Sequence, residues 1–67
     1  MTQIDVNGAP FSVPAGQTLS GLLEHLGLAA QGIALAVNRE VVPRQQWLER
    51  RLQQNDKVDI VRAIGGG

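Results

Sequence analysis

A single leucine stripe limits the architecture that this chain can adopt. The spacing i, i+3, i+4 and i+7 places four leucines on one face of a predicted helix: Leu19, Leu22, Leu23 and Leu26. Thr18 can cap the helix N-terminus, and Gly27 can take the left-handed conformation that ends a helix. No other segment shows so clear a helical period, so one main helix must share the core with whatever the remaining residues form.

The other apolar segments are typical of strands. Residues 2–13 alternate apolar and polar residues around Asn7-Gly8, which predicts a hairpin with a tight turn. Residues 33–37 form a continuous apolar run, which favours a strand inside the sheet with both of its faces covered. Further strands are expected at residues 41–42 and 58–61, with a short helical piece after Pro43. One helix covers one face of a sheet, so we predict a two-layer α+β fold with a mixed sheet, whose strand order remains open.

Composition narrows the functional class. The 67 residues suffice for one small domain, and the absence of cysteine excludes disulfides and thiolate metal sites. Six basic and six acidic residues give a net charge of zero, which argues against nonspecific nucleic-acid binding. No apolar run approaches the roughly 20 residues that span a bilayer, and the N-terminus does not resemble a secretory signal. We therefore expect a cytoplasmic protein without a membrane segment.

The titratable residues offer little for catalysis. His25 lies off the leucine stripe and is expected to be a surface residue without metal partners. Asp56 and Asp59 flank a predicted turn, where carboxylates are commonly solvated. Ligand pockets occupy roughly 300–1,000 Å³, which so short a chain can hardly enclose. The sequence thus predicts a protein that binds no metal or cofactor and is not itself an enzyme.

The chain finishes on "VRAIGGG", in which Gly65, Gly66 and Gly67 follow Ile64 directly. We expect a domain over residues 1–64 and a flexible tail over residues 65–67 that would reach about 10 Å from the fold. A terminal carboxylate is ionised at neutral pH and is a poor electrophile until another enzyme activates it. Glycine has no Cβ, so such a tail can enter a narrow active site. A frayed or artificially extended end is the simpler alternative.

The chain resembles the thiamine-biosynthesis sulfur carrier (ThiS) family along essentially its whole length. The residues that carry the resemblance are Ala36-Val37-Asn38, then Val42-Pro43-Arg44 and Trp47, and the terminal Gly66-Gly67. The resemblance implies a ubiquitin-like β-grasp fold, in which the first and last strands pair in parallel at the centre of the sheet. Trp47 is expected to pack within the domain rather than to contact a partner.

The resemblance also implies a chemistry for the tail. The carboxylate of Gly67 would be adenylated by an E1-like enzyme (ThiF) with ATP and magnesium, and a sulfur-transfer enzyme would supply the sulfur of a thiocarboxylate. Thiazole synthase (ThiG) would then receive that sulfur. Gly65 and Gly66 would occupy the enzyme channel, although the family pattern needs only two glycines, and Gly66 would react if Gly67 were an addition.

Partner docking is assigned to Arg62 and Ile64, because an enzyme that holds the glycines must pass over both. Two alternatives stay open: a molybdopterin-synthase sulfur carrier, and a ubiquitin-like interaction module or protein modifier. The sequence does not identify the immediate sulfur donor or the oligomeric state.

Overall fold

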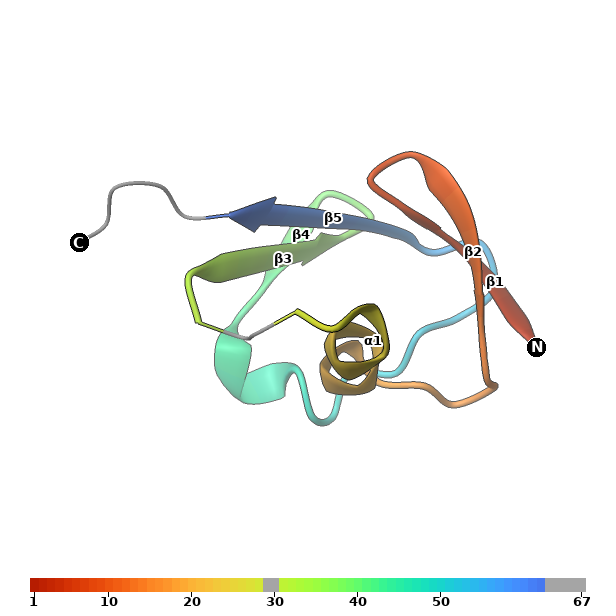
Figure 1. Ribbon diagram of the computed structural model, residues 1–67, viewed down its shortest axis with the longest axis horizontal. Coiled ribbons are helices and arrows are strands. Elements are labelled where there is room, and N and C mark those ends of the chain that lie inside the picture. Colours follow the sequence, from red (N-terminus) through yellow and green to blue (C-terminus); the bar gives the residue numbers. More distant parts are fainter. Residues whose placement is uncertain (29–30, 63–67) are drawn as a thin grey trace.

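The computed structural model describes residues 1–28 and 31–62 (Figure 1). The elements in chain order are β1 (Thr2–Val6), β2 (Ala9–Val13), α1 (Leu19–Leu26), β3 (Ile33–Val37), β4 (Glu40–Val42), the 3₁₀ helix η1 (Arg44–Gln46) and β5 (Lys57–Arg62). The five strands form one sheet in the order β2-β1-β5-β3-β4. β1 and β5 run parallel at the centre, and the other neighbours are antiparallel. The predicted mixed sheet and the parallel central pair are both confirmed.

The hairpin of β1 and β2 turns where the sequence predicted it. Asn7 and Gly8 both have positive φ, 51° and 85°, and β1 and β2 pair on either side of them from Val6 and Ala9. A two-residue turn with positive φ at both positions matches the right-handed twist of the strands, and Asn-Gly adopts it at low cost. The turn therefore fixes the register of the hairpin.

Helix α1 is bounded by the two predicted caps. The Thr18 hydroxyl accepts a hydrogen bond from the Gly21 amide at 3.1 Å, and Gly27 ends the helix with φ 72°. α1 lies across one face of the sheet (Figure 1), where three of its leucines are buried and Leu26 is half-buried. The leucine stripe thus forms the helix side of the core.

The core joins the helix to all five strands and to the segment after η1. Its buried apolar side chains are Ile4, Val13, Leu19, Leu22, Leu23, Leu35, Val37, Val42, Trp47, Leu52 and Val58. The Trp47 indole donates a buried hydrogen bond from Nε1 to the Val42 carbonyl at 2.8 Å, which ties the end of β4 to the end of η1. The expectation that Trp47 packs within the domain is confirmed.

Strand β3 is only partly as predicted. It lies inside the sheet, between β5 and β4, and Leu35 and Val37 are buried against the helix layer. The expectation that both of its faces are covered is wrong, because Ala34 is exposed and Ala36 only half-buried on the other face. A continuous apolar run resembles a strand buried on both faces, but here small alanines face the side without the helix.

Asp56 also departs from expectation. The carboxylate is buried, accepting hydrogen bonds from Asn38 Nδ2 at 3.0 Å and from the Gln53 amide at 2.8 Å. Asp59, in contrast, is exposed as predicted. Asp56 is therefore an internal anchor of the loop before β5 rather than a solvated turn residue.

Candidate functional site

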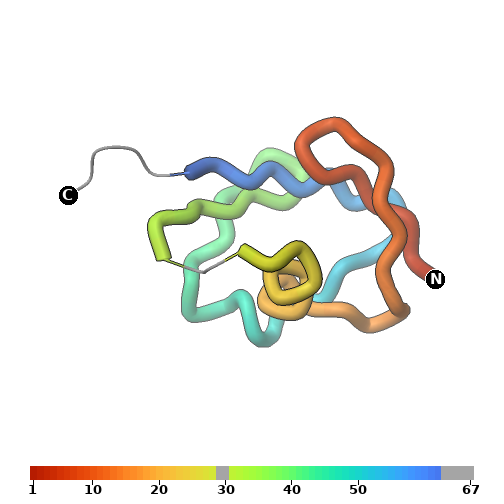
Figure 2. The backbone as a smooth tube through the Cα atoms, viewed as in Figure 1, coloured from red at the N-terminus to blue at the C-terminus, as the bar shows by residue number. Residues whose placement is uncertain are grey.

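The strand that leads to the chain's end is the central one. β5 pairs with β3 over all of its residues except Lys57, from Val58 opposite Val37 to Arg62 opposite Ile33. Figure 2 shows β5 running to the side of the molecule opposite the start of β1. The direction in which the chain leaves the domain is thus set by a strand with neighbours in the sheet rather than by a surface loop.

The start of β5 is fixed by the turn between β3 and β4. Asn38 has φ 54°, a conformation that asparagine tolerates. Its backbone amide donates to the Lys57 carbonyl at 2.7 Å, and its side-chain Oδ1 accepts from the Lys57 backbone amide at 3.0 Å. Asp56 holds the same side chain through Nδ2. One residue of the family-like stretch 36–38 therefore positions the strand that carries the tail.

Asn7 performs a similar task on the other side of β5. Its backbone amide donates to the Val58 carbonyl at 2.9 Å, and its side-chain Oδ1 accepts from the Ile60 amide at 2.8 Å. The sequence identified Asn7 only as a turn former. Nothing in the local pattern indicates the second role, because Ile60 lies 53 residues away.

The predicted site residues lie at and beyond the end of β5. Arg62 is exposed at the last position of that strand, and its docking role stays a prediction. Ile64, Gly65, Gly66 and Gly67 lie outside the described residues, so their roles remain predictions.

An exposed apolar patch lies on the sheet face opposite α1 and includes Val61, the residue before Arg62 in the chain; it was not predicted from the sequence. It consists of Val61, which is 59% exposed, Val41, which is 73% exposed, and the two small residues between them, Ala34 and Ala36. Cross-strand pairing joins Val61 to Ala34 and Ala36 to Val41. The alternation of Ile60 and Val61 was the available signal, since only one of two successive strand residues faces the helix layer.

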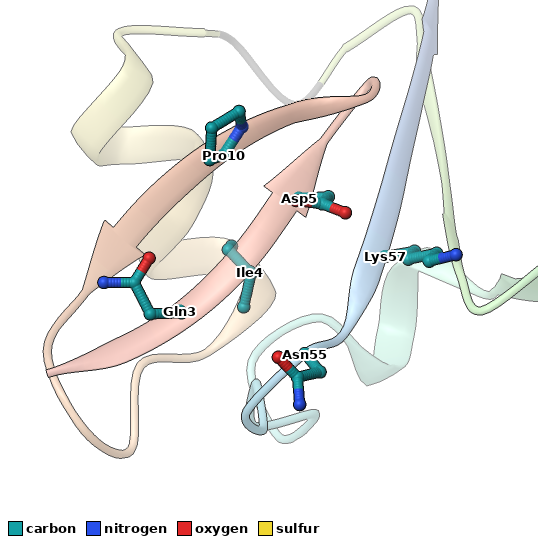
Figure 3. A pocket seen from close by; sticks show the side chains of 6 residues that line it. All are labelled: Gln3, Ile4, Asp5, Pro10, Asn55 and Lys57. Atoms are coloured by element: carbon teal, nitrogen blue, oxygen red, sulfur yellow. The ribbon is translucent and has the colours of Figure 1, made fainter.

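The pockets of the described part of the chain lie elsewhere. One, of about 290 Å³, opens between β1 and the beginning of β5 (Figure 3) and is lined by Gln3, Ile4, Asp5, Pro10, Asn55 and Lys57. A second, of about 280 Å³, shares Asp5 and Lys57 with the first and adds Arg39 and Asp59. Both are formed around the start of β5, away from Arg62.

The described residues, 1–28 and 31–62, contain the chain's histidine and all of its acidic side chains. In these ranges no three His, Asp or Glu side chains come together as a metal site. His25 is exposed, as predicted, and meets the Phe11 ring edge-on with the centroids 5.6 Å apart. None of the helices in these ranges is long and apolar enough to cross a membrane.

Comparison with known proteins identifies the family. The ThiS family model matches residues 4–67, nearly the whole chain. The chain belongs to the ThiS family. The sulfur carrier protein ThiS of Escherichia coli (strain K12) is 40% identical over 65 residues, which cover 97% of this chain and 98% of that protein. A thiazole synthase of Magnetococcus marinus is 42% identical over 65 residues, although this chain spans only 20% of its length.

Solved structures agree with the family assignment. The crystal structure of a thiamine biosynthesis protein (ThiS) from Geobacter metallireducens matches with a TM-score of 0.86 and 28% identity, covering 98% of this chain and 100% of that one. The fold is therefore the ubiquitin-like β-grasp that the resemblance implied, with a mixed five-stranded sheet and one α-helix in the described residues.

Proposed function

We propose that this protein is the sulfur carrier that supplies the sulfur atom for the thiazole ring of thiamine. The observation that carries the proposal is the ThiS family match, which extends through the terminal glycines to residue 67. The fold supports it, because the central strand β5 leads directly into residues 63–67. A folded domain followed by three glycines is suited to placing a terminal carboxylate inside another protein.

The reaction proceeds at the carboxylate of Gly67 in two steps. A carboxylate oxygen attacks the α-phosphate of ATP, which releases pyrophosphate and leaves an acyl-adenylate. Hydrosulfide (HS⁻) then attacks the carbonyl carbon and displaces AMP, and loss of the S–H proton leaves a thiocarboxylate on the chain. ATP and magnesium belong to an E1-like activating enzyme (ThiF), and a sulfur-transfer enzyme supplies the sulfur. Gly65 and Gly66 occupy the channel, with Arg62 and Ile64 at its entrance.

Thiazole synthase (ThiG) is the proposed acceptor. Segments similar to this chain occur within thiazole synthases of Magnetococcus marinus and Paramagnetospirillum magneticum, at 42% and 34% identity. A carrier and its acceptor joined in one protein would meet at high effective concentration. This favours the thiazole pathway over a molybdopterin acceptor. On this proposal the chain is a substrate and donor for enzymes, acts in the cytoplasm, and binds no cofactor of its own.

Intact mass spectrometry tests the proposal directly. The chain is incubated with ATP, magnesium, the activating enzyme and a sulfur source, and its mass should rise by one sulfur minus one oxygen. Thiazole synthase should remove that sulfur again. A lysine-linked adduct would identify a protein modifier instead, and sulfur transfer only to molybdopterin synthase would identify the alternative carrier.

Two tail variants test the assignment to Gly67. Gly67→Val keeps the length but places a branched side chain beside the reacting carbonyl, so charging should fall to background. A chain that lacks Gly67 still ends in two glycines, but its carboxylate falls short by roughly 3.3–3.6 Å and should charge poorly. If this shortened chain is charged as fast as the full chain, Gly66 is a competent reactive residue and the assignment to Gly67 is wrong.

A further inference from the structure

The central strand β5 extends further than β1, one of its two neighbours. The register of the β1–β5 pair contains only Asp5 with Lys57 and Val6 with Val58. On the other side, β3 stays paired with β5 as far as Arg62. The last part of β5 therefore pairs with β3 on one edge, while β1 does not reach its other edge.

The hydrogen bonds show which groups the open edge presents. The Val58 carbonyl and the Ile60 amide both point toward the hairpin, where they bond to Asn7. In a strand, the polar groups of alternate residues point to the same edge. The Ile60 carbonyl and the Arg62 amide are thus the next pair along that edge. Within the described residues, the hairpin turns away at Asn7 and Gly8, before it reaches them.

We propose that this edge, formed by the Ile60 carbonyl and the Arg62 amide, binds an extended segment of thiazole synthase as an added parallel strand. The inference rests on the proposed function and specifies how the acceptor enzyme holds the carrier. In a parallel pair, the N–H of one residue in the added strand donates to a carbonyl of the first strand. The C=O of that same residue accepts from the first strand's amide two residues further along. A single enzyme residue opposite Val61 therefore satisfies both groups.

An antiparallel strand fits this edge less well. Antiparallel pairing joins both polar groups of one residue to the partner. At Ile60 the amide is already bonded to Asn7 Oδ1, so only the carbonyl is available there. The parallel arrangement continues the direction of β1 and leaves the Asn7 contact intact.

The position of the edge favours an enzyme that receives the tail, and the segments similar to this chain within thiazole synthases favour the acceptor over the activating enzyme. The chain continues from Arg62 directly into residues 63–67, so a strand bound beside Ile60 and Arg62 fixes where the glycines enter. Peptide recognition at a sheet edge draws its affinity from main-chain bonds and its specificity from alternate side chains. The enzyme residue opposite Val61 lies on the same face as that exposed valine, so an apolar side chain is expected there.

Amide hydrogen exchange measures the proposed contact without any mutation. In the ¹⁵N-labelled carrier, the Arg62 amide should exchange at least about tenfold more slowly when the protein is saturated with thiazole synthase. The Val61 amide is the internal reference, because it already faces β3, opposite Ala34, in the free protein. Unchanged exchange at Arg62 in the saturated complex would overturn the proposal. Slowing that depends on carrier concentration alone would also overturn it, since the occupant would then be a second copy.

Two substitutions at one position separate the backbone from the side chain. Arg62→Pro removes the amide hydrogen, whereas Arg62→Ala keeps it and removes only the guanidinium group. The dissociation constant for thiazole synthase should be about tenfold or more higher for Arg62→Pro than for Arg62→Ala, and Arg62→Ala alone measures what the docking side chain contributes. The Arg62 amide faces away from β3, so proline is tolerated as it is on edge strands. Equal binding by the two variants would contradict the proposal.

If Arg62→Pro misfolds, a semisynthetic chain tests the same Arg62 hydrogen bond. An ester in place of the amide between Val61 and Arg62 removes the same hydrogen without constraining φ, and it should weaken binding to a similar extent. Sulfur transfer from the thiocarboxylated wild-type chain distinguishes a failure of the proposed function from a failure of the strand-addition proposal alone. If the wild-type chain donates no sulfur, the proposed function fails and this inference fails with it. If it donates sulfur and the ester chain binds equally well, only the strand-addition proposal is wrong.

Discussion

Asp56 shows how one buried carboxylate organises the loop before β5. Its two oxygens accept from different donors, Asn38 Nδ2 and the Gln53 amide, and Asn38 Oδ1 in turn accepts from the Lys57 amide. Among the described residues, no buried side-chain polar atom lacks a partner. The arrangement leaves each oxygen facing a donor, so it requires a group that only accepts at both positions.

Asp56→Asn tests this requirement. The new amide nitrogen must face either Asn38 Nδ2 or the Gln53 amide, and either choice places two donors together. We expect the free energy of unfolding to fall by about 1–3 kcal/mol, the cost of an unsatisfied buried group. Urea unfolding monitored by Trp47 fluorescence measures it. Asp59→Asn, on an exposed carboxylate, is the matched control and should change stability by less than about 0.5 kcal/mol. Equal losses in both variants would contradict this account of Asp56.

Local sequence patterns predict the roles of some single residues but not of others. Helix caps and turn formers act on neighbours a few positions away, so Thr18, Gly27 and Asn7-Gly8 could be assigned from local patterns. Asp56 forms a hydrogen bond with a residue 18 positions away, and no nearby sequence pattern indicates that its carboxylate is buried. His25 was correctly placed on the surface because the helical period alone decides it.

At the scale of elements, the Asn7 side chain extends the β1–β5 pairing by one step. A continuing strand would offer its next backbone carbonyl to the Ile60 amide, but the chain has already begun to turn. Asn7 Oδ1 takes that place at 2.8 Å. The turn residue therefore sets where β1 stops pairing with β5 and where the free edge begins.

Asn7→Gly tests this role, since glycine permits the positive φ but offers no acceptor. The Ile60 amide should exchange about tenfold faster, the effect of one lost hydrogen bond. The Val61 amide faces β3 and should be affected less, because the lost contact is local. Asn7→Asp retains an acceptor at Oδ1 and tolerates positive φ, so Ile60 exchange should stay near the wild-type rate. Equal acceleration at Ile60 and Val61 would indicate general destabilisation instead.

Elements were predicted better than the faces they expose. The hairpin, α1, β3 and the final strand all appear where periodicity placed them, because periodicity reports local backbone geometry. The sequence wrongly predicted that both faces of β3 are covered, because alanine is an apolar residue that occurs on covered and on exposed faces alike. The pairing of β1 with β5 was available only through the family resemblance. Contacts between residues more than 50 positions apart leave no periodic signal.

At the scale of the whole molecule, the core and the chain's end are separate parts. The buried apolar residues of the described chain extend from Ile4 to Val58, so none belongs to the last four residues described. β5 nevertheless carries the chain out of the centre of the sheet. Stability is thus expected to depend on the domain over residues 1–64, and sulfur transfer on Gly65–Gly67.

A chain that ends at Ile64 tests this separation. Its free energy of unfolding should match that of the full chain within about 0.5 kcal/mol, because no residue of the described core is removed. Leu35→Ala in the full-length chain provides the opposite case: it removes part of a fully buried side chain and should cost about 2–5 kcal/mol. The truncated chain should form no thiocarboxylate, whereas Leu35→Ala should still be charged wherever it remains folded. A truncated chain that loses more than about 1 kcal/mol would show that Gly65–Gly67 contribute to the stability of the domain.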